Sequence, residues 1–364
     1  MKALICLGTR PEVIKLFPVE RALRERTSIE PVTLALRQQA QLLDQSFASV
    51  EWKPDRVVER SVAGYSLSQM FAGLLLAMEE EIDREKPGVV IVQGDTTTAL
   101  AASVAAFYAK VPVAHVEAGL RTWNFEQPFP EEMHRACVDV FARFCFAPTQ
   151  ASADNLLKAG VPRERISITG NTVVDALNYV VARLPAQRQY PVAAGQRRVV
   201  VTCHRRENFE RGIAAVCSAV GTLSARPELD FLITLHPNPN VRTTIDQALV
   251  DGPRLKKIEP LPYRDFVHVL RSAWLVLTDS GGIQEEATAL GVPFLVLRED
   301  TERPEGLQAG TGRLVGTDAD RVVAEVNALL ADSARYRAMA TPSEVFGDGR
   351  AAERIADTLK AALG

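Results

Sequence analysis

The sequence has few cysteines, almost no excess charge and no long apolar run, and each shortage excludes a class of protein. Its five cysteines are scattered through 364 residues in apolar settings without a CxxC pair, which indicates reduced core thiols in a cytosolic protein and no metal site. The net charge of −3 gives no bulk attraction to nucleic acid or membranes. Charged or turn residues interrupt every apolar run before it could span a membrane, and the first eight residues indicate a strand, not a signal peptide. We therefore expect a cytoplasmic protein.

The alternation of apolar and amphipathic stretches predicts an α/β protein. Strand-like runs alternate with helical patterns along the chain, as in parallel sheets whose crossover connections are helices. The length is too great for a typical single domain and sufficient for two. We expect two doubly wound domains, at 1–170 and 171–345. We also expect a last helix, within 346–364, that crosses back to the first domain.

The predicted elements fall into two series. The first comprises strands at 2–7, 31–36, 89–93, 112–116 and 144–147, with helices at 11–26, 64–85, 96–109 and from Glu131 onward. The second comprises strands at 198–202, 231–235, 255–258, 274–277 and 293–297, with helices at 210–225, 240–250, 263–272, 282–290, from 320 onward and at 350–363.

The stretch Thr278–Glu286 combines a strand end, a serine, paired glycines and a helix start. The apolar run Ala273–Leu277 predicts a buried strand, and Ile283–Leu290 predicts a helix. Paired glycines let a ligand approach the backbone closely, and the N–H groups of a helix start attract an anion. Glu286 lies one turn into the helix, within reach of a ribose hydroxyl pair. The stretch is a candidate site for a nucleotide diphosphate, although alone it is more typical of an ordinary strand-to-helix turn.

Polar residues also follow the other predicted strands. Because ligands of doubly wound sheets bind outside the carboxyl ends of the strands, we expect these residues to converge on a cleft between the domains. Each has a structural alternative: Asp95 suits a helix N-cap, for example, and Glu131 and Glu132 suit the first turn of a helix. Two lone histidines, His115 and His268, are interpreted as structural. The strand-end set, which together favours a shared site, is Gly8–Glu12 with Lys15, Asp95, Glu117, His204–Asn208 and His236–Asn238.

Seven segments, in order and over nearly the whole chain, resemble motifs of the non-hydrolysing UDP-N-acetylglucosamine 2-epimerases. They are Gly8–Glu12, Gln93–Thr98, His115–Thr122, Pro128–Glu132, His204–Asn208, Asp279–Glu286 and Thr301–Glu305. The resemblance implies two Rossmann-like domains facing an interdomain cleft, the fold shared with GT-B-type glycosyltransferases. It also implies a cytosolic homodimer, without a cofactor, that converts UDP-N-acetylglucosamine (UDP-GlcNAc) to UDP-N-acetylmannosamine (UDP-ManNAc) for cell-surface polysaccharide synthesis.

The resemblance further implies a role for each candidate residue. The substrate would be bound by Ser280, Gly281, Gly282 and Arg10 at the diphosphate, Glu286 at the ribose, Phe266 and the backbone near Leu261 at the uracil, and Arg303 at the sugar or a phosphate. The reacting sugar would be surrounded by Lys15, Asp95, Glu117 and Glu131, and His204 would assist at the diphosphate.

The implied reaction explains why cations and carboxylates are needed together. No carbonyl is attached to carbon 2 of the sugar, so its direct deprotonation is unfavourable. The family eliminates UDP to give 2-acetamidoglucal and then adds it back with the proton on the opposite face. Elimination needs cations at the departing diphosphate, a role that Arg10, Lys15 and His204 fit. It also needs carboxylates around the ring, and crowding them should raise the pKa of at least one.

Other outcomes stay open at the level of sequence. Residues 37–41 lack the glycine and histidine that relatives activated by a second UDP-GlcNAc often carry, so such activation is left open. Arg10–Glu12 favours the non-hydrolysing branch over a hydrolysing 2-epimerase, but the substrate could be a UDP-2,3-diacetamido sugar. A retaining glycosyltransferase fits less well, because the motifs of Asp95 and Glu117 argue against it. A sugar-nucleotide-binding regulator without catalysis is the non-enzymatic alternative.

Overall fold

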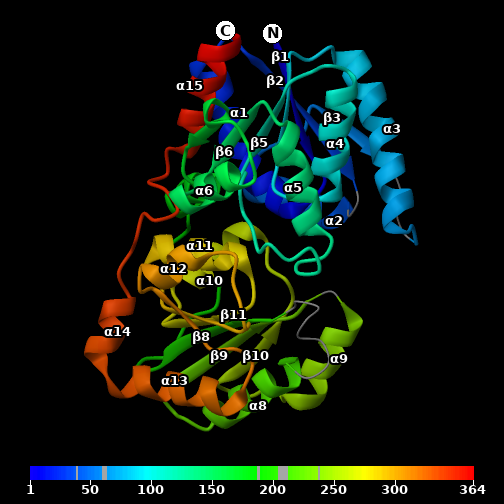
Figure 1. The fold of residues 1–364 in the computed structure, drawn as a ribbon. Coiled ribbons are helices and arrows are strands. Elements are labelled where there is room, and N and C mark those ends of the chain that lie inside the picture. Colours follow the sequence, from blue (N-terminus) through cyan, green and yellow to red (C-terminus); the bar gives the residue numbers. More distant parts are fainter. Residues whose placement is uncertain (38–39, 60–63, 187–188, 204–211, 237) are drawn as a thin grey trace. The chain divides into compact units, whose positions relative to one another are not determined.

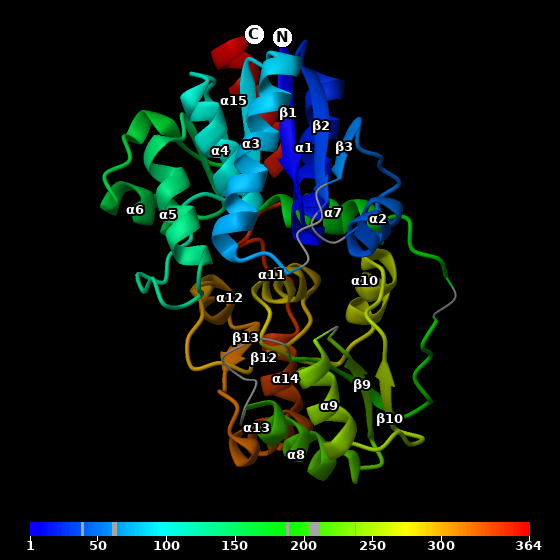
Figure 2. The ribbon, with the colours of Figure 1, turned by 90° about the vertical axis from the view of Figure 1, so that its right-hand side faces the viewer.

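The computed structural model describes residues 1–364 except 38–39, 60–63, 187–188, 204–211 and 237 (Figure 1). The chain forms two compact units, unit 1 (1–179 and 347–364) and unit 2 (180–346). Each unit has a parallel sheet with helices on both faces, as Figures 1 and 2 show. The predicted fold class of two Rossmann-like domains is confirmed. Among the described residues, no helix is long and apolar enough to cross a bilayer.

The described strands of unit 1 run in the order β3-β2-β1-β4-β5-β6-β7. They are β1 (Lys2–Leu7), β2 (Glu30–Arg37), β3 (Arg56–Glu59), β4 (Val89–Gln93), β5 (Val113–Val116), β6 (Phe144–Ala147) and β7 (Ile166–Ile168). The helices are α1 (Arg10–Arg26), α2 (Ala40–Ser49), α3 (Leu67–Glu85), α4 (Thr97–Tyr108), α5 (Glu131–Phe141), α6 (Gln150–Lys158), α7 (Thr172–Val181) and α15 (Ala351–Leu363).

The described strands of unit 2 run in the order β10-β9-β8-β11-β12-β13, which repeats the winding of unit 1. They are β8 (Arg197–Thr202), β9 (Leu229–Thr234), β10 (Leu255–Ile258), β11 (Leu275–Thr278), β12 (Phe294–Val296) and β13 (Gly312–Leu314). The helices are α8 (Gly212–Ser224), α9 (Pro239–Ala248), α10 (Tyr263–Arg271), α11 (Gly281–Leu290), α12 (Pro304–Gln308), α13 (Ala319–Ala331) and α14 (Ser333–Met339).

Burial on both faces explains the continuous apolar strands. Every residue of β4 is buried, as expected when helices cover a parallel sheet on both sides. On one face, α3, α4, α5 and α6 share a core with β1, β2 and β4. The small buried residues of α4, such as Ala102 and Ala106, allow it to pack closely between α3 and α5. This packing fixes the ends of β4 and β5, where the candidate residues lie.

One cysteine contradicts the expectation of buried core thiols. Cys6, Cys145, Cys203 and Cys217 are buried, but Cys137 on α5 is exposed. Its neighbour Val138 points into the core. Because successive helical residues point in directions about 100° apart, an apolar neighbour in sequence does not imply a shared buried face.

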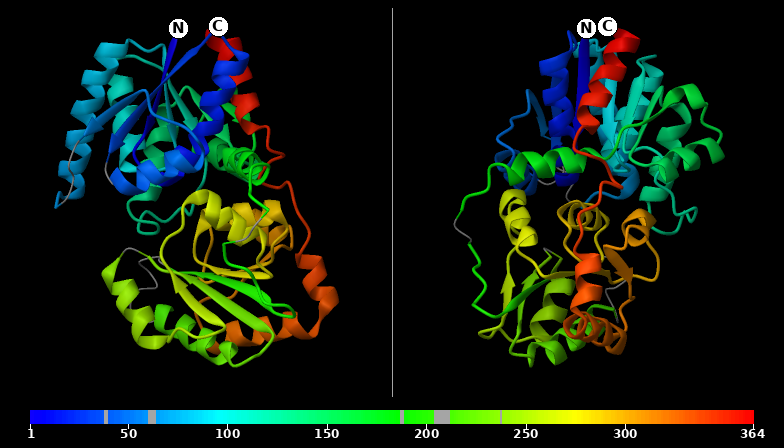
Figure 3. Two further views of the ribbon diagram at one scale, coloured as in Figure 1. Left: turned by 180° about the vertical axis from the view of Figure 1, so that it is seen from behind. Right: turned by 90° about the vertical axis from the view of Figure 1, so that its left-hand side faces the viewer.

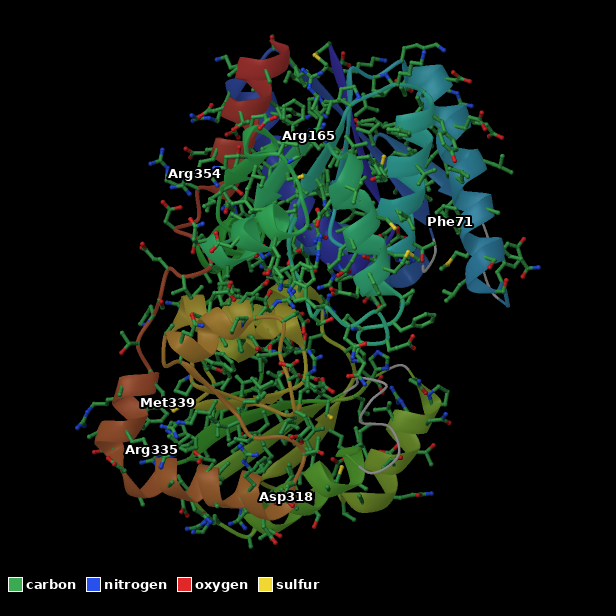
Figure 4. All side chains as sticks on the ribbon, viewed as in Figure 1. Phe71, Arg165, Asp318, Arg335, Met339 and Arg354 are labelled. Carbon is green, nitrogen blue, oxygen red and sulfur yellow. The ribbon has the colours of Figure 1, made fainter. Side chains whose placement is uncertain are left out.

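The C-terminal helix α15 begins on a carboxylate of α7. The Asp175 side chain accepts hydrogen bonds from the N–H groups of Ala351 (3.2 Å) and Ala352 (2.9 Å), which open the helix. Burial raises the pKa of Asp175 to about 6, although these two bonds oppose the shift. The helix then packs along α1, as Figure 3 shows. Near its start, Arg354 (labelled in Figure 4) pairs with Asp348 at 2.7 Å.

We expect Asp175→Asn to remove a pH-dependent part of the stability. Because the folded-state pKa lies above the usual value of about 4, the folded state binds more protons than the unfolded state between about pH 4 and 6. The stability contributed by Asp175 therefore falls as the pH rises through this window. From pH 4 to pH 7, the free energy of unfolding of the wild type should drop by about 2 kcal/mol relative to Asp175→Asn in chemical denaturation.

Asp348→Asn is the matched control. The hydrogen bonds from Arg354 lower the pKa of Asp348 to about 2, so its contribution is lost only at lower pH. Between pH 4 and pH 7 the difference in the free energy of unfolding between this variant and the wild type should change far less, because the charge of Asp348 is the weakest of the effects that raise or lower the pKa of Asp175. If the difference in the free energy of unfolding between Asp175→Asn and the wild type did not change with pH, the carboxylate at the start of α15 would not titrate as described.

Candidate active site

Three neighbouring strands of unit 1 carry candidate residues at their carboxyl ends. β1 pairs with β4, and β4 pairs with β5, in parallel register. The loop at Gly8–Arg10 follows β1, Asp95 follows β4, and Glu117 follows β5. Since parallel strands end at the same edge, the three turns lie side by side at one edge of the sheet (Figure 1).

Glu117 and Lys15 form a buried ion pair at this edge. The Lys15 Nζ lies 2.6 Å from Oε1 and 2.7 Å from Oε2 of Glu117, and both side chains are buried. The amide groups of Gln93 and Asn171 also donate to this carboxylate. Glu117 has a φ of 66°, a left-handed conformation that costs free energy for a residue with a side chain. The carboxylate is therefore paired with a cation and fixed in direction.

Glu12 joins the turn after β1 to the turn after β4. Its carboxylate accepts from the N–H groups of Gly8 (2.9 Å) and Thr9 (2.7 Å) and from the Thr96 hydroxyl (2.6 Å). Burial raises the pKa of Glu12, while these hydrogen bonds act in the opposite direction. Arg10, the half-buried first residue of α1, follows this turn. The sequence analysis gave Glu12 no role, although Thr9 and Glu12 have the spacing of a capping box.

Asp95 is held by α5 and keeps part of its side chain accessible. Its Oδ2 lies 2.7 Å from Nη2 of Arg135, and 27% of the Asp95 side chain is exposed. The backbone carbonyl of Asp95 contacts Nδ1 of His134 at 2.9 Å. The alternative role of Asp95 as a helix cap is wrong, because Thr96 caps α4 by accepting from the Ala99 N–H.

The two glutamates that begin α5 differ in their surroundings. Glu131, the candidate catalytic residue, is half-buried at the first position of the helix. Glu132 is buried and accepts from the N–H groups of Thr122 (3.1 Å) and Trp123 (2.9 Å). Glu132 thus anchors the loop between β5 and α5, a role that the sequence analysis did not anticipate.

In unit 2, the start of α11 lies against an arginine. Ser280 is the N-cap residue, and Gly281 and Gly282 are the first two residues of the helix. A Cβ added to Gly281 would lie 2.2 Å from Nη1 of Arg303, whereas one added to Gly282 would meet no atom within 4 Å. Glycine is therefore required at 281 for the close approach of the guanidinium.

Two carboxylates fix the Arg303 guanidinium. Its Nε donates to Glu285 at 2.6 Å, and its Nη1 donates to Glu302 at 2.6 Å. Glu302 also accepts from Arg298 at 2.7 Å. The guanidinium is thus held in one orientation beside the start of a helix, whose N–H groups and dipole favour an anion such as a phosphate.

The remaining candidates of unit 2 lie around the same helix. Leu261 and Phe266 are buried in a core with Ala287 of α11, and Ile283 packs against it. Glu286 is buried on α11, nearly two turns after Ser280. The candidate residue His204 lies outside the residues that the structure describes. The same holds for residues 38–39 of the segment 37–41, which the sequence analysis linked to activation by a second UDP-GlcNAc.

Comparison with solved structures first identifies the fold class of the protein. The fold of two Rossmann-like domains is shared with proteins as distant as the glycosyltransferase of kitacinnamycin, which has a TM-score of 0.67 at 14% identity and covers 100% of this chain and 99% of that one. That likeness concerns the fold alone. The carboxylate–lysine pair in one domain and the arginine-flanked helix start in the other suit a protein that binds a nucleotide sugar.

The family follows from closer relatives. The model of the UDP-N-acetylglucosamine 2-epimerase family matches residues 21–360, and the chain belongs to this family. The UDP-N-acetylglucosamine 2-epimerase of Salmonella typhimurium is 42% identical over 370 residues, which cover 99% of this chain and 98% of the relative. The structure of UDP-GlcNAc 2-epimerase from Neisseria meningitidis bound to UDP-GlcNAc has a TM-score of 0.95 at 38% identity and covers 99% of both chains.

Proposed function

We propose that this chain interconverts UDP-GlcNAc and UDP-ManNAc without hydrolysis, a step that feeds cell-surface polysaccharide synthesis. The observation that carries the proposal is the buried pair of Lys15 and Glu117 at the strand edge that also bears Asp95. Family membership supplies the substrate, since the Neisseria meningitidis relative binds UDP-GlcNAc.

In this proposal the resemblance assigns substrate-binding groups to each unit. In unit 2, the start of α11 and the fixed Arg303 suit the diphosphate, because both present positive charge to an anion. Arg10 of unit 1 adds a cation, and Lys15 lies near the reacting sugar. The remaining assignments follow the resemblance: Glu286 binds the ribose, Phe266 and the backbone near Leu261 contact the uracil, and His204 assists at the diphosphate.

The reaction proceeds by elimination and re-addition. The bond between carbon 1 and the diphosphate oxygen breaks, a carboxylate accepts the proton of carbon 2, and a double bond forms between carbons 1 and 2. UDP then adds back to carbon 1, while a second, protonated carboxyl group of the set delivers its proton to the opposite face of carbon 2. In this proposal the carboxyl groups of Glu117, beside Lys15, and of Asp95, beside Arg135, stabilise positive charge on the ring and take part in moving the proton of carbon 2. Glu131 is the third carboxylate of the set.

Proton NMR in deuterium oxide with UDP-GlcNAc alone tests this function. We expect UDP-ManNAc with deuterium at carbon 2 and no accumulation of UDP. Accumulation of UDP with free N-acetylmannosamine would show hydrolysis instead. No reaction of UDP-GlcNAc, at any concentration of added substrate, would contradict the proposal and point to another UDP-sugar or to a transferase that awaits its acceptor.

We further propose a homodimer formed through α4 and α5. These helices pack on each other and expose large apolar side chains, among them Phe107 (57%), Tyr108 (74%) and Val140 (65%). Such neighbouring apolar groups favour a protein partner, and a second copy of the chain is the simplest one.

The dimer can be tested by the mass in solution. The wild type should have the mass of two chains in size-exclusion chromatography with light scattering, and Val140→Asp should shift it to one, because the change buries an unpaired charge in the interface. Leu157→Asp, on the exposed side of α6, is the matched control and should remain dimeric. A wild type that elutes as a monomer, or a Val140→Asp variant that stays dimeric, would contradict this interface.

A further inference from the structure

Helix α5 carries a buried charge that the mechanism above does not use. Asp139, near the end of this helix, is fully buried, and its Oδ1 lies 2.6 Å from Nδ1 of His115. Its Oδ2 lies 2.7 Å from Nη2 of Arg121 and accepts from the Gly119 N–H at 3.2 Å. Burial raises the pKa of Asp139, but the charges and hydrogen bonds of His115 and Arg121 outweigh this effect and leave the pKa below its usual value.

Two contacts of this cluster lead to backbone next to a proposed catalytic carboxylate. The Nε2 of fully buried His115 lies 2.8 Å from the carbonyl oxygen of Gly94, the residue before Asp95. Gly119, whose N–H binds Asp139, is two residues after Glu117. A carbonyl only accepts, so Nε2 donates its proton to Gly94, while Nδ1 faces the carboxylate of Asp139. One carboxylate and one imidazole thus connect the turns after β4 and β5.

The backbone at these turns needs such support. Gly94, Glu117 and Gly119 all have positive φ, at 69°, 66° and 88°. A left-handed conformation at Glu117 is disfavoured by its side chain, and it persists only where the surroundings determine it. Gly94 also lies next to the Glu117 carboxylate, since a Cβ added there would be 3.9 Å from Oε2. A shift of either turn would therefore change the position of Glu117 relative to the backbone of Asp95.

We propose that Asp139 and His115 are positioning residues for the epimerase reaction, which hold the turns that carry Asp95 and Glu117 at a fixed separation. The inference rests on the proposed function. Both side chains are fully buried, so they act through the backbone and not through contact with the substrate. Their loss should misplace the carboxylates while leaving the substrate-binding groups of unit 2 unchanged.

Asp139→Asn and His115→Gln test the inference. We expect each to lower kcat by about 100-fold with little change in KM, because a displacement of about 1 Å at reacting groups costs about that much. The exposed acid Asp83 on α3, which pairs with Lys86 at 3.1 Å, supplies the control Asp83→Asn, which should keep the wild-type kcat. If Asp139 and His115 act together by joining the turns after β4 and β5, the kcat of the double variant should be no lower than that of the slower single variant.

A kinetic isotope effect separates positioning from a purely structural role. With substrate deuterated at carbon 2, misplaced carboxylates make proton transfer slower, so the isotope effect on kcat should rise in both variants. Partial unfolding lowers the active fraction but leaves the isotope effect unchanged. Variants with the wild-type kcat per folded molecule and the wild-type isotope effect would overturn the inference.

His115→Gln decides the matter if Asp139→Asn does not fold, because it keeps the pair of Asp139 and Arg121. The wild type is measured in the same assay. If the wild type does not epimerise UDP-GlcNAc, the proposed function fails and this inference fails with it. If the wild type is active and His115→Gln equals it in kcat and isotope effect, only the positioning role is overturned.

Discussion

Glu117→Gln should lower the epimerase turnover by about 100- to 10,000-fold, the usual contribution of a positioned acid or base. Glutamine keeps the size of the side chain but cannot accept or deliver the proton of carbon 2. The change also leaves the Lys15 ammonium, which is buried against this carboxylate, without its compensating charge. Turnover would be measured by NMR, and UDP binding by calorimetry. UDP should bind nearly as in the wild type, since Glu117 is not among the groups assigned to UDP.

Glu81→Gln is the matched control for this prediction. Glu81 is an equally buried acid of unit 1, paired with Arg56 (2.7 Å) and Arg84 (2.6 Å) on the side of α3, away from the strand-end turns. Both variants should lose stability, but only Glu117→Gln should lose turnover. A Glu117→Gln variant that turned over within about tenfold of the wild type would remove Glu117 from the proton-transfer step.

Gly281→Ala should weaken UDP binding by about 10- to 100-fold, the cost of losing a hydrogen bond to a charged group of about 1.5–3 kcal/mol. The new Cβ would lie 2.2 Å from Nη1 and 2.6 Å from Cζ of Arg303, so the guanidinium has to move. Moving it breaks the ion pairs with Glu285 and Glu302, which are both buried. We therefore expect the variant to melt at a lower temperature as well.

Gly282→Ala separates the two effects. A Cβ at this neighbouring position meets no atom of the protein within 4 Å, so the unliganded variant should melt like the wild type. In the proposed function, the added Cβ takes up space at the diphosphate. UDP affinity should therefore fall without a change in stability. Equal melting temperatures for Gly281→Ala and Gly282→Ala would show that Arg303 is not held against the helix start.

The fold was most predictable where strands are buried on both faces. The runs at 2–7, 89–93 and 144–147 were predicted with the observed bounds, because long apolar stretches are a strong signal. The missed strands β3, β7 and β13 lie at sheet edges and have only three or four residues, some of them polar. Such short segments show too little periodicity to be recognised. The helices α2, α6, α7 and α12 were also missed.

The candidate site was predictable as a set of strand ends but not as a network of contacts. The winding order of a doubly wound sheet brings the ends of β1, β4 and β5 together, so Asp95 and Glu117 could be placed at one edge. The pairing of Lys15 with Glu117 joins residues 102 positions apart, and no local pattern indicates it. For the same reason, Asp139 and Arg135 were not singled out. Their roles depend on which face of α5 meets the sheet.

Positional isotope exchange tests the elimination route most directly. UDP-GlcNAc would carry oxygen-18 in the bridge between carbon 1 and the β-phosphorus, and recovered substrate would be analysed after partial conversion. The account predicts that the label spreads to the non-bridging oxygens of the β-phosphate, because the bond to carbon 1 breaks in each turnover. Epimerisation with deuterium uptake at carbon 2, but with the label retained in the bridge, would contradict the elimination of UDP.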